Sequence, residues 1–354
     1  MRLPTLTIDT EKIEHNTRVV AAMLRERGMR LVGVSKSALS HPAVVKAMTQ
    51  GGVAAIGDSR VENLMRARED GYLGETILLR APAPSRIDEA VAFADISLNS
   101  EVTIVKMLGK AARKAGKTHK VVLMVDLGDL REGVQVHRAL DVAKDMSLVE
   151  GVEFAGIGVN LACYGGIIPT PEKMLQLLKV RDSIEASLGR KLQIVSGGNS
   201  ANMRLVMEKS MPPGITELRI GESVLLGTEA VCRSPVPGCH RDAFTVSAEV
   251  IEVQVKPSKP QGEIGQNAFG GVVTFADRGI RKRAICSIGR QDIDPDGLTP
   301  VQPGVEILGA SSDHLLLDIQ DAPSIKVGSV VTFVTAYSAL LRAATSPFVE
   351  KVVR

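Results

Sequence analysis

The chain has 354 residues, of which 44% are hydrophobic and 23% are charged. This is the composition of a globular protein with a sizeable core. A net charge of +3 is too small to indicate a nucleic-acid or membrane-surface partner. The sequence starts without the apolar segment of a signal peptide and contains no run of about eighteen apolar residues, so we expect a cytoplasmic protein. Its four cysteines include no CxxC pair, and we predict neither a disulfide framework nor a metal site.

The first two thirds of the chain alternate short β-branched runs with longer amphipathic segments such as 171–181. The strand-like runs number eight and cover residues 31–36, 54–58, 76–80, 96–99, 121–127, 153–161, 192–198 and 217–222. Eight strand–helix units predict a closed (β/α)₈ barrel of the TIM type. The alternative is an open doubly wound sheet, which would normally carry a GxGxxG turn after its first strand, and residues 34–40 do not resemble one.

The pattern changes near Arg233-Ser-Pro-Val-Pro-Gly, where two prolines and a glycine indicate a linker. Beyond it the helical period disappears until the last twenty or so residues, and strand-like runs dominate. They cover residues 244–256, 284–288, 305–308, 315–319 and 330–334. We therefore predict a barrel domain over 1–235 and a β-rich domain over 236–354, with roughly the first ten residues open to packing with the second domain.

Polar residues stand at or near the carboxyl ends of the eight predicted strands. In strand order they are Lys36, Asp58, Arg80, Asn99, Arg131, Asn160, Asn199 with Ser200, and Arg219. Barrel enzymes build their active sites at this rim. The ring of polar residues therefore predicts an active site at that end of the barrel.

Lys36 follows the apolar run Leu-Val-Gly-Val-Ser, so its amine is expected at the mouth of an apolar barrel. Partial desolvation lowers the pKa of a lysine, and Schiff-base chemistry needs a neutral amine. The alternative is a lysine that reaches solvent or pairs with Asp58.

Two glycine-rich turns follow the last two predicted strands. The first begins Ser196-Gly-Gly-Asn-Ser and the second reads Arg219-Ile-Gly-Glu-Ser. Adjacent turns of this kind after strands seven and eight form the usual phosphate site of a barrel, because their backbone N–H groups point at one position.

A set of motifs in a fixed order completes the pattern. They are Thr7-Ile-Asp-Thr, Val34-Ser-Lys-Ser, Gly57-Asp-Ser-Arg-Val-Glu-Asn, Asp126-Leu-Gly-Asp-Leu-Arg-Glu-Gly, Gly156-Ile-Gly-Val-Asn, Gly197-Gly-Asn-Ser, Leu218-Arg-Ile-Gly-Glu, Pro260-Gln-Gly-Glu-Ile-Gly, Gly289-Arg-Gln-Asp and Gly309-Ala-Ser-Ser-Asp-His. On these motifs the chain resembles the fold-type-III pyridoxal-phosphate enzymes, the alanine racemase superfamily, and within it most closely the ornithine racemase group. The resemblance covers nearly the whole length.

The resemblance implies pyridoxal 5′-phosphate as the cofactor. The residues that would hold it are Lys36, Arg131, Asn160, Asn199, Ser200, Arg219, Gly221, Glu222 and Tyr337. Lys36 would carry the cofactor and act as one of two acid–base groups at the substrate Cα. Arg219 would face the pyridine nitrogen, and since an arginine keeps its proton, it disfavours a protonated pyridinium and favours reprotonation at Cα over transamination.

The second acid–base group departs from the family pattern. Alanine racemases use a tyrosine at the position where this chain has Arg290, and arginine is a poor base. The candidates are His314 or Asp313, with Cys163 and Tyr337 as alternatives; histidine has the most suitable ordinary pKa.

The loop Ser311-Ser-Asp-His, which contains Asp313 and His314, also concerns the substrate and the assembly. In the family it comes from the partner subunit, which implies a homodimer with shared active sites. Ser312, Asp313 and Arg290 are predicted to contact the substrate, and Asp313 or Asp292 could meet a distal ammonium group.

The sequence therefore predicts a racemase that interconverts L- and D-amino acids, in particular a basic one such as ornithine or lysine. A proton would leave Cα of the external aldimine and return on the opposite face. One alternative is a non-catalytic pyridoxal-phosphate carrier, which would lack the second domain. Another is a metal-assisted D-amino acid aldolase or dehydratase, for which His314 with Asp313 is only a partial match.

Overall fold

A computed structural model describes residues 2–272 and 274–354. The chain divides into two compact units. One comprises Thr10–Arg241, and the other joins the segment that ends at Asp9 to Asp242–Arg354. The division thus falls a few residues beyond the linker identified in the sequence, and the start of the chain belongs with the second unit.

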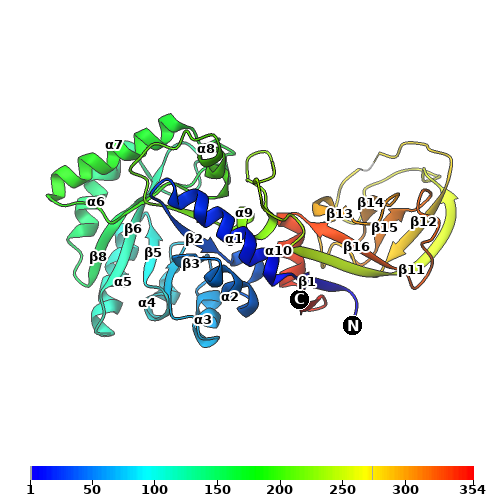
Figure 1. The fold of residues 1–354 in the computed structure, drawn as a ribbon, viewed down its shortest axis with the longest axis horizontal. Coiled ribbons are helices and arrows are strands. Elements are labelled where there is room, and N and C mark those ends of the chain that lie inside the picture. The colour runs from blue at the N-terminus through cyan, green and yellow to red at the C-terminus, as the bar shows by residue number, and fades with distance from the viewer. Residues whose placement is uncertain (1, 273) are drawn as a thin grey trace. The chain divides into compact units, whose positions relative to one another are not determined.

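Within the described residues, eight parallel strands close into a barrel in the order β2-β3-β4-β5-β6-β8-β9-β10, with β10 paired back to β2 (Figure 1). They are β2 (Arg30–Val34), β3 (Ala55–Asp58), β4 (Glu75–Leu78), β5 (Ile96–Asn99), β6 (His119–Asp126), β8 (Val152–Gly158), β9 (Ile194–Ser196) and β10 (Glu217–Ile220). A short strand, β7 (Val134–Gln135), adds to β6 outside the barrel. The predicted (β/α)₈ barrel and all eight of its strands are confirmed.

Helices cover the outside of the barrel strands (Figure 1). They are α1 (Thr10–Arg25), α2 (Pro42–Gln50), α3 (Val61–Glu69), α4 (Ile87–Phe93), α5 (Val102–Lys114), α6 (Ala139–Ser147), α7 (Pro171–Leu188), α8 (Met203–Met207) and α9 (Glu222–Leu226), with 3₁₀ turns η1 (Lys36–Ala38), η2 (Pro84–Arg86), η3 (Val136–Arg138) and η4 (Ser200–Asn202). Pro42 and Pro171 open their helices, where a missing N–H removes no helical hydrogen bond. Thr170 caps α7 by accepting a hydrogen bond from the backbone N–H of Lys173.

The barrel interior is filled by apolar side chains from alternate positions of the strands. This cluster consists of Val32, Ala55, Ile77, Ile96, Leu98, Val122, Met124, Ala155 and Ile194. Gly156 lies so close to β9 that a Cβ at this position would stand 1.9 Å from the carbonyl oxygen of Ile194. Because strand side chains alternate, the residues between the cluster members face the helices instead.

The second unit is β-rich and largely antiparallel, as predicted. Its elements are β1 (Thr5–Ile8), β11 (Phe244–Pro257), β12 (Ile280–Cys286), η5 (Pro295–Gly297), β13 (Leu298–Pro300), β14 (Glu306–Ala310), β15 (Leu315–Asp318), β16 (Val330–Thr335), α10 (Tyr337–Thr345) and β17 (Glu350–Val353). Strand β1 pairs with β11 and with β17, which fixes the start of the chain in this sheet. Over the described residues, every helix is too short or too polar to cross a membrane.

Candidate active site

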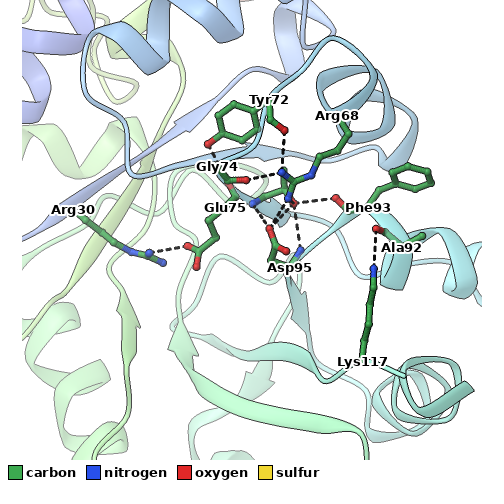
Figure 2. A network of polar contacts seen from close by, with 10 residues as sticks. Arg30, Arg68, Tyr72, Gly74, Glu75, Ala92, Phe93, Asp95 and Lys117 are labelled. Carbon is green, nitrogen blue, oxygen red and sulfur yellow. Dashed lines mark hydrogen bonds and ion pairs between the residues drawn. The ribbon is translucent and has the colours of Figure 1, made fainter. Parts of the chain in front are cut away.

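The amino end of the barrel carries a network of polar groups that bind one another (Figure 2). Arg68 donates hydrogen bonds to the carbonyl oxygens of Tyr72 and Gly74, and one to Asp95 at 2.7 Å. Arg30 forms an ion pair of 2.7 Å with Glu75. Such contacts at this end of a barrel serve stability, because the loops that carry chemistry lie at the other end.

Arg219 on β10 is the central charged group at the carboxyl end. It is only 4% exposed, and it donates to the hydroxyl of Ser196 and, at 2.8 Å, to the carbonyl oxygen of Val159. Gly158 on β8 lies next to it, since a Cβ there would stand in ordinary contact, 3.5 Å, with its Nη1. Burial lowers the pKa of Arg219 from its ordinary value, but a guanidinium starts so high that it stays charged.

Two asparagines beside this arginine form a pair. Asn199 donates from Nδ2 to Asn160 Oδ1 at 3.0 Å and to the carbonyl oxygen of Leu161 at 2.8 Å. Its own Oδ1 accepts from the backbone N–H of Ala201. The Nδ2 of Asn160 is buried and has no hydrogen-bond partner among the described residues. A buried donor left unpaired is costly, so this amide marks a position where an acceptor on a bound molecule fits.

The two glycine-rich turns meet as predicted. The hydroxyl of Ser200, after β9, accepts from the backbone N–H of Ser223, after β10, at 3.3 Å. Gly221 opens α9 and approaches β2, where a Cβ would stand 3.1 Å from the carbonyl oxygen of Val34. The Glu222 carboxylate forms an ion pair of 3.0 Å with Arg233, and burial raises its pKa. The predicted role of Glu222 therefore rests on its backbone.

Arg131 lies in the loop after β6 and has two partners. Its Nε and Nη2 donate to the carboxylate of Glu132, and its Nη1 lies 2.7 Å from Cys163 Sγ in the loop after β8. The hydrogen bond with Glu132 raises the pKa of Arg131. The structure thus joins two loops that are 32 residues apart in the chain.

Two buried aspartates hold these loops. Asp126 Oδ1 accepts from the backbone N–H groups of Gly128 at 2.8 Å and Leu130 at 3.2 Å. Asp129 accepts from the N–H groups of Tyr164 at 2.9 Å and Ile167 at 3.3 Å. Burial by itself would raise the pKa of Asp129, but the backbone donors outweigh it and the pKa is lowered.

Lys36 begins η1, two residues after the last residue of β2, and is half-buried. The ring of eight polar residues predicted for the rim is wrong at Asp58 and Asn99. The Asp58 carboxylate accepts hydrogen bonds from Ser35, Ser40 and Asn63, and Asn99 donates to the carbonyl oxygen and hydroxyl of Ser97. The physical reason is alternation: the neighbours of these residues on β3 and β5 point inward, so their own side chains face the helices. Arg80 is exposed, two residues beyond β4.

Two residues of this site were not singled out by the sequence prediction. Ser196 holds Arg219, and Glu132 holds Arg131. Alternation from Ile194 would have placed Ser196 on the inner face of β9. No sequence pattern distinguishes Glu132 from an ordinary surface carboxylate.

In the second unit, the structure brings together the two predicted substrate loops. The backbone N–H of Arg290 donates to Ser311 at 2.8 Å, and a Cβ at Gly289 would stand 2.3 Å from the backbone nitrogen of Asp313. His314 Nδ1 lies 3.1 Å from Asp313 Oδ1. These loops therefore form one structural element.

The other predicted residues of this unit are placed as follows. Arg290 lies within 3.9 Å of Asp294 and Asp296, and Asp292 accepts from Ser346 at 2.6 Å. The half-buried Tyr337 begins α10. Over the described residues, no three His, Cys, Asp or Glu side chains gather as a metal site would require.

Comparisons with known proteins extend the sequence resemblance. The family described as "Alanine racemase, N-terminal domain" matches residues 8–229. The chain is 42% identical over 352 residues to the lysine racemase of Thermotoga maritima, covering 99% of both chains, and 41% identical over 350 residues to the ornithine racemase of Acetoanaerobium sticklandii, covering 98% of this chain and 99% of that one. The crystal structure of alanine racemase from Streptomyces lavendulae superposes with a TM-score of 0.74 at 18% identity, covering 100% of this chain and 98% of that chain. The last likeness shows the fold alone.

Replacing Asp129 by alanine should loosen the loop over residues 162–167, because its backbone donors lose their acceptor. We expect faster amide hydrogen exchange there and a free energy of unfolding lower by about 1–3 kcal/mol at neutral pH. Since the folded-state pKa is lowered, the difference from the unsubstituted chain should be complete above the unfolded-state pKa of about 4 and shrink as the pH falls further. Asp145→Ala, at an exposed position of α6, is the control, and equal exchange in the two variants would refute the assignment.

Proposed function

The chain belongs to the alanine racemase family, and from this premise we propose that it is a pyridoxal-phosphate-dependent racemase of a basic amino acid such as lysine or ornithine. The racemase prediction is preferred over the carrier and aldolase alternatives, because relatives named as racemases match this chain over 98–99% of its length. The names of these two relatives support a basic substrate. The observation that carries the cofactor assignment is the buried, charged Arg219 next to the unpaired amide of Asn160.

The residues at the barrel mouth fit pyridoxal phosphate. Asn160 offers a buried N–H donor without a partner among the described residues. Ser200 and the turn at Gly221 lie together after β9 and β10, where barrels bind phosphate. Lys36 follows β2, which pairs with β10, so its backbone lies beside the phosphate turn.

In this proposal Lys36 holds the cofactor covalently and Arg219 faces the pyridine nitrogen. Arg131 and Asn160 lie at the ring. The phosphate is bound by Ser200, Asn199, Gly221, Glu222 and Tyr337. When bound, the cofactor withdraws electrons from the substrate Cα and so makes its proton acidic. Arg219 keeps its own proton because a guanidinium is not deprotonated in proteins, and its side chain donates to a hydroxyl and to a carbonyl oxygen. It therefore donates a hydrogen bond to the pyridine nitrogen without transferring its proton, which favours the return of a proton to Cα.

Racemisation needs a proton-transfer group on each face of Cα. Lys36 serves one face in our proposal, and His314, oriented by the carboxylate of Asp313, serves the other from a second subunit of a homodimer. Ser312, Asp313 and Arg290 then contact the substrate, and a carboxylate of this loop receives its distal ammonium group. A cytoplasmic location stays a prediction from the sequence, which cell fractionation tests.

Incubating the purified protein with pyridoxal phosphate and single L-amino acids in deuterated buffer tests the proposed activity. We expect D-lysine or D-ornithine with deuterium at Cα, since the returning proton comes from groups that exchange with solvent. Chiral chromatography with mass spectrometry measures both products. Bound cofactor without Cα exchange on any amino acid would instead support the carrier alternative.

Lys36→Ala should abolish the visible absorption band of the bound cofactor and lower kcat by at least about a thousandfold, because both the covalent link and one proton-transfer group are lost. Lys46→Ala, at an exposed position of α2, is the matched control and should keep both. A Lys36→Ala variant that retains the band would reject the assignment of this lysine.

Mixing two inactive variants tests the second group and the shared site together. Lys36→Ala and His314→Asn homodimers should each be inactive, and after subunit exchange about a quarter of the sites should again hold both residues, because half of the dimers are mixed and each has one intact site. The rate of racemisation measures the recovery. An active His314→Asn homodimer would remove His314 from the mechanism, and failure to recover activity in proven heterodimers would exclude shared sites.

A further inference from the structure

The contact between Arg131 and Glu132 differs from the other ion pairs of neighbouring residues in this chain. Arg181 and Asp182 on α7 form a similar pair, in which both donors reach one carboxylate. Arg131 has a second partner, Cys163 Sγ at 2.7 Å, on a different loop of the barrel mouth. The side chain of Arg131 is 37% exposed and that of Glu132 is 31% exposed, so burial does not fix either side chain and their mutual contacts must do so.

The backbone on both sides of this cluster is strained. Leu130 and Ala162 have φ angles of 55° and 50°, in the left-handed region that costs a residue with a side chain about 1 kcal/mol or more. Each directly precedes a member of the contact, Arg131 in one case and Cys163 in the other. The carboxylate of Asp126 holds the first loop and that of Asp129 the second. Two strained loops are therefore fixed where they bring these side chains together.

The carboxylate of Glu132 lies against the guanidinium of Arg131 and neutralises its charge. Burial is the main cause that lowers the pKa of Arg219; Glu217 and Glu132 raise that pKa, and Arg131 lowers it.

We propose that Glu132 is a positioning residue: its carboxylate fixes the guanidinium of Arg131 against Cys163 and neutralises its charge. This inference rests on the proposed function, because Arg131 is there assigned to the cofactor ring. It adds a residue that acts through Arg131 and does not itself touch cofactor or substrate.

The test compares Glu132→Gln with the unsubstituted holoenzyme. Glutamine keeps the size of the side chain but has no charge and offers one acceptor oxygen. We expect kcat to fall about tenfold to a hundredfold, the absorption spectrum of the bound cofactor to shift, and the midpoint of thermal unfolding to stay unchanged. Asp182→Asn removes the charge of the similar pair on α7 and should change none of the three.

A double-mutant cycle with Arg131→Met shows whether Glu132 acts through Arg131. In the Arg131→Met background, adding Glu132→Gln should change kcat less than about twofold. The inference is overturned if Glu132→Gln behaves like Asp182→Asn, or if its effect is undiminished when Arg131 is absent.

A crystal structure of the Glu132→Gln protein without cofactor separates this inference from the proposed function. We expect the guanidinium of Arg131 to leave Cys163 Sγ by more than a hydrogen-bond length, about 3 Å. If the unsubstituted protein neither binds the cofactor nor racemises any amino acid, the proposed function fails, and the position of Arg131 in this crystal still decides whether Glu132 holds it. An unmoved guanidinium would overturn the inference.

Discussion

A positive charge buried inside the barrel mouth is the constraint on which the rest of the site depends. Arg219 lies on β10 among parallel strands, and its guanidinium is accommodated because Ser196 and Val159 supply oxygen acceptors. A buried charge of this kind is tolerated only with such partners. The strands that supply them, β8 and β9, must therefore lie in register with β10, and the closed barrel provides that register.

The two ends of the barrel differ in how fully their polar groups are paired. At the amino end, Arg68 donates hydrogen bonds to two carbonyl oxygens and to Asp95, and these bonds link neighbouring strands and loops. At the carboxyl end, the pairing between Asn160 and Asn199 leaves one amide without a partner among residues 2–272 and 274–354. In barrel enzymes the loops at the carboxyl ends of the strands carry the chemistry, and an unpaired buried donor at that end is a position where an acceptor of a bound molecule fits.

The loops of the site are held by carboxylates that accept backbone N–H groups. Asp126 and Asp129 do this for the loops after β6 and β8. Because a carboxylate binds several N–H donors at once, it can hold a loop in a conformation that its residues would not adopt by themselves, as at Leu130 and Ala162. The position of Arg131 is therefore a property of two loops and not of its own sequence neighbours.

The sequence by itself determined the barrel, the β-rich second unit and the two adjacent glycine-rich turns. Hydrophobic periodicity is a local property, and eight strand–helix units have few ways to bury their apolar faces. The motifs around Lys36, Ser200 and Arg219 lie at strand ends, so their place in the barrel follows from the strand assignment. Tertiary structure decided which of the polar strand ends face the mouth. Asp58 and Asn99 turn to the helices because strand alternation depends on which neighbours enter the core. Cys163 meets Arg131 only because a closed barrel brings separate loops to one end. Contacts between residues far apart in the chain depend on closure and register, which no local pattern encodes.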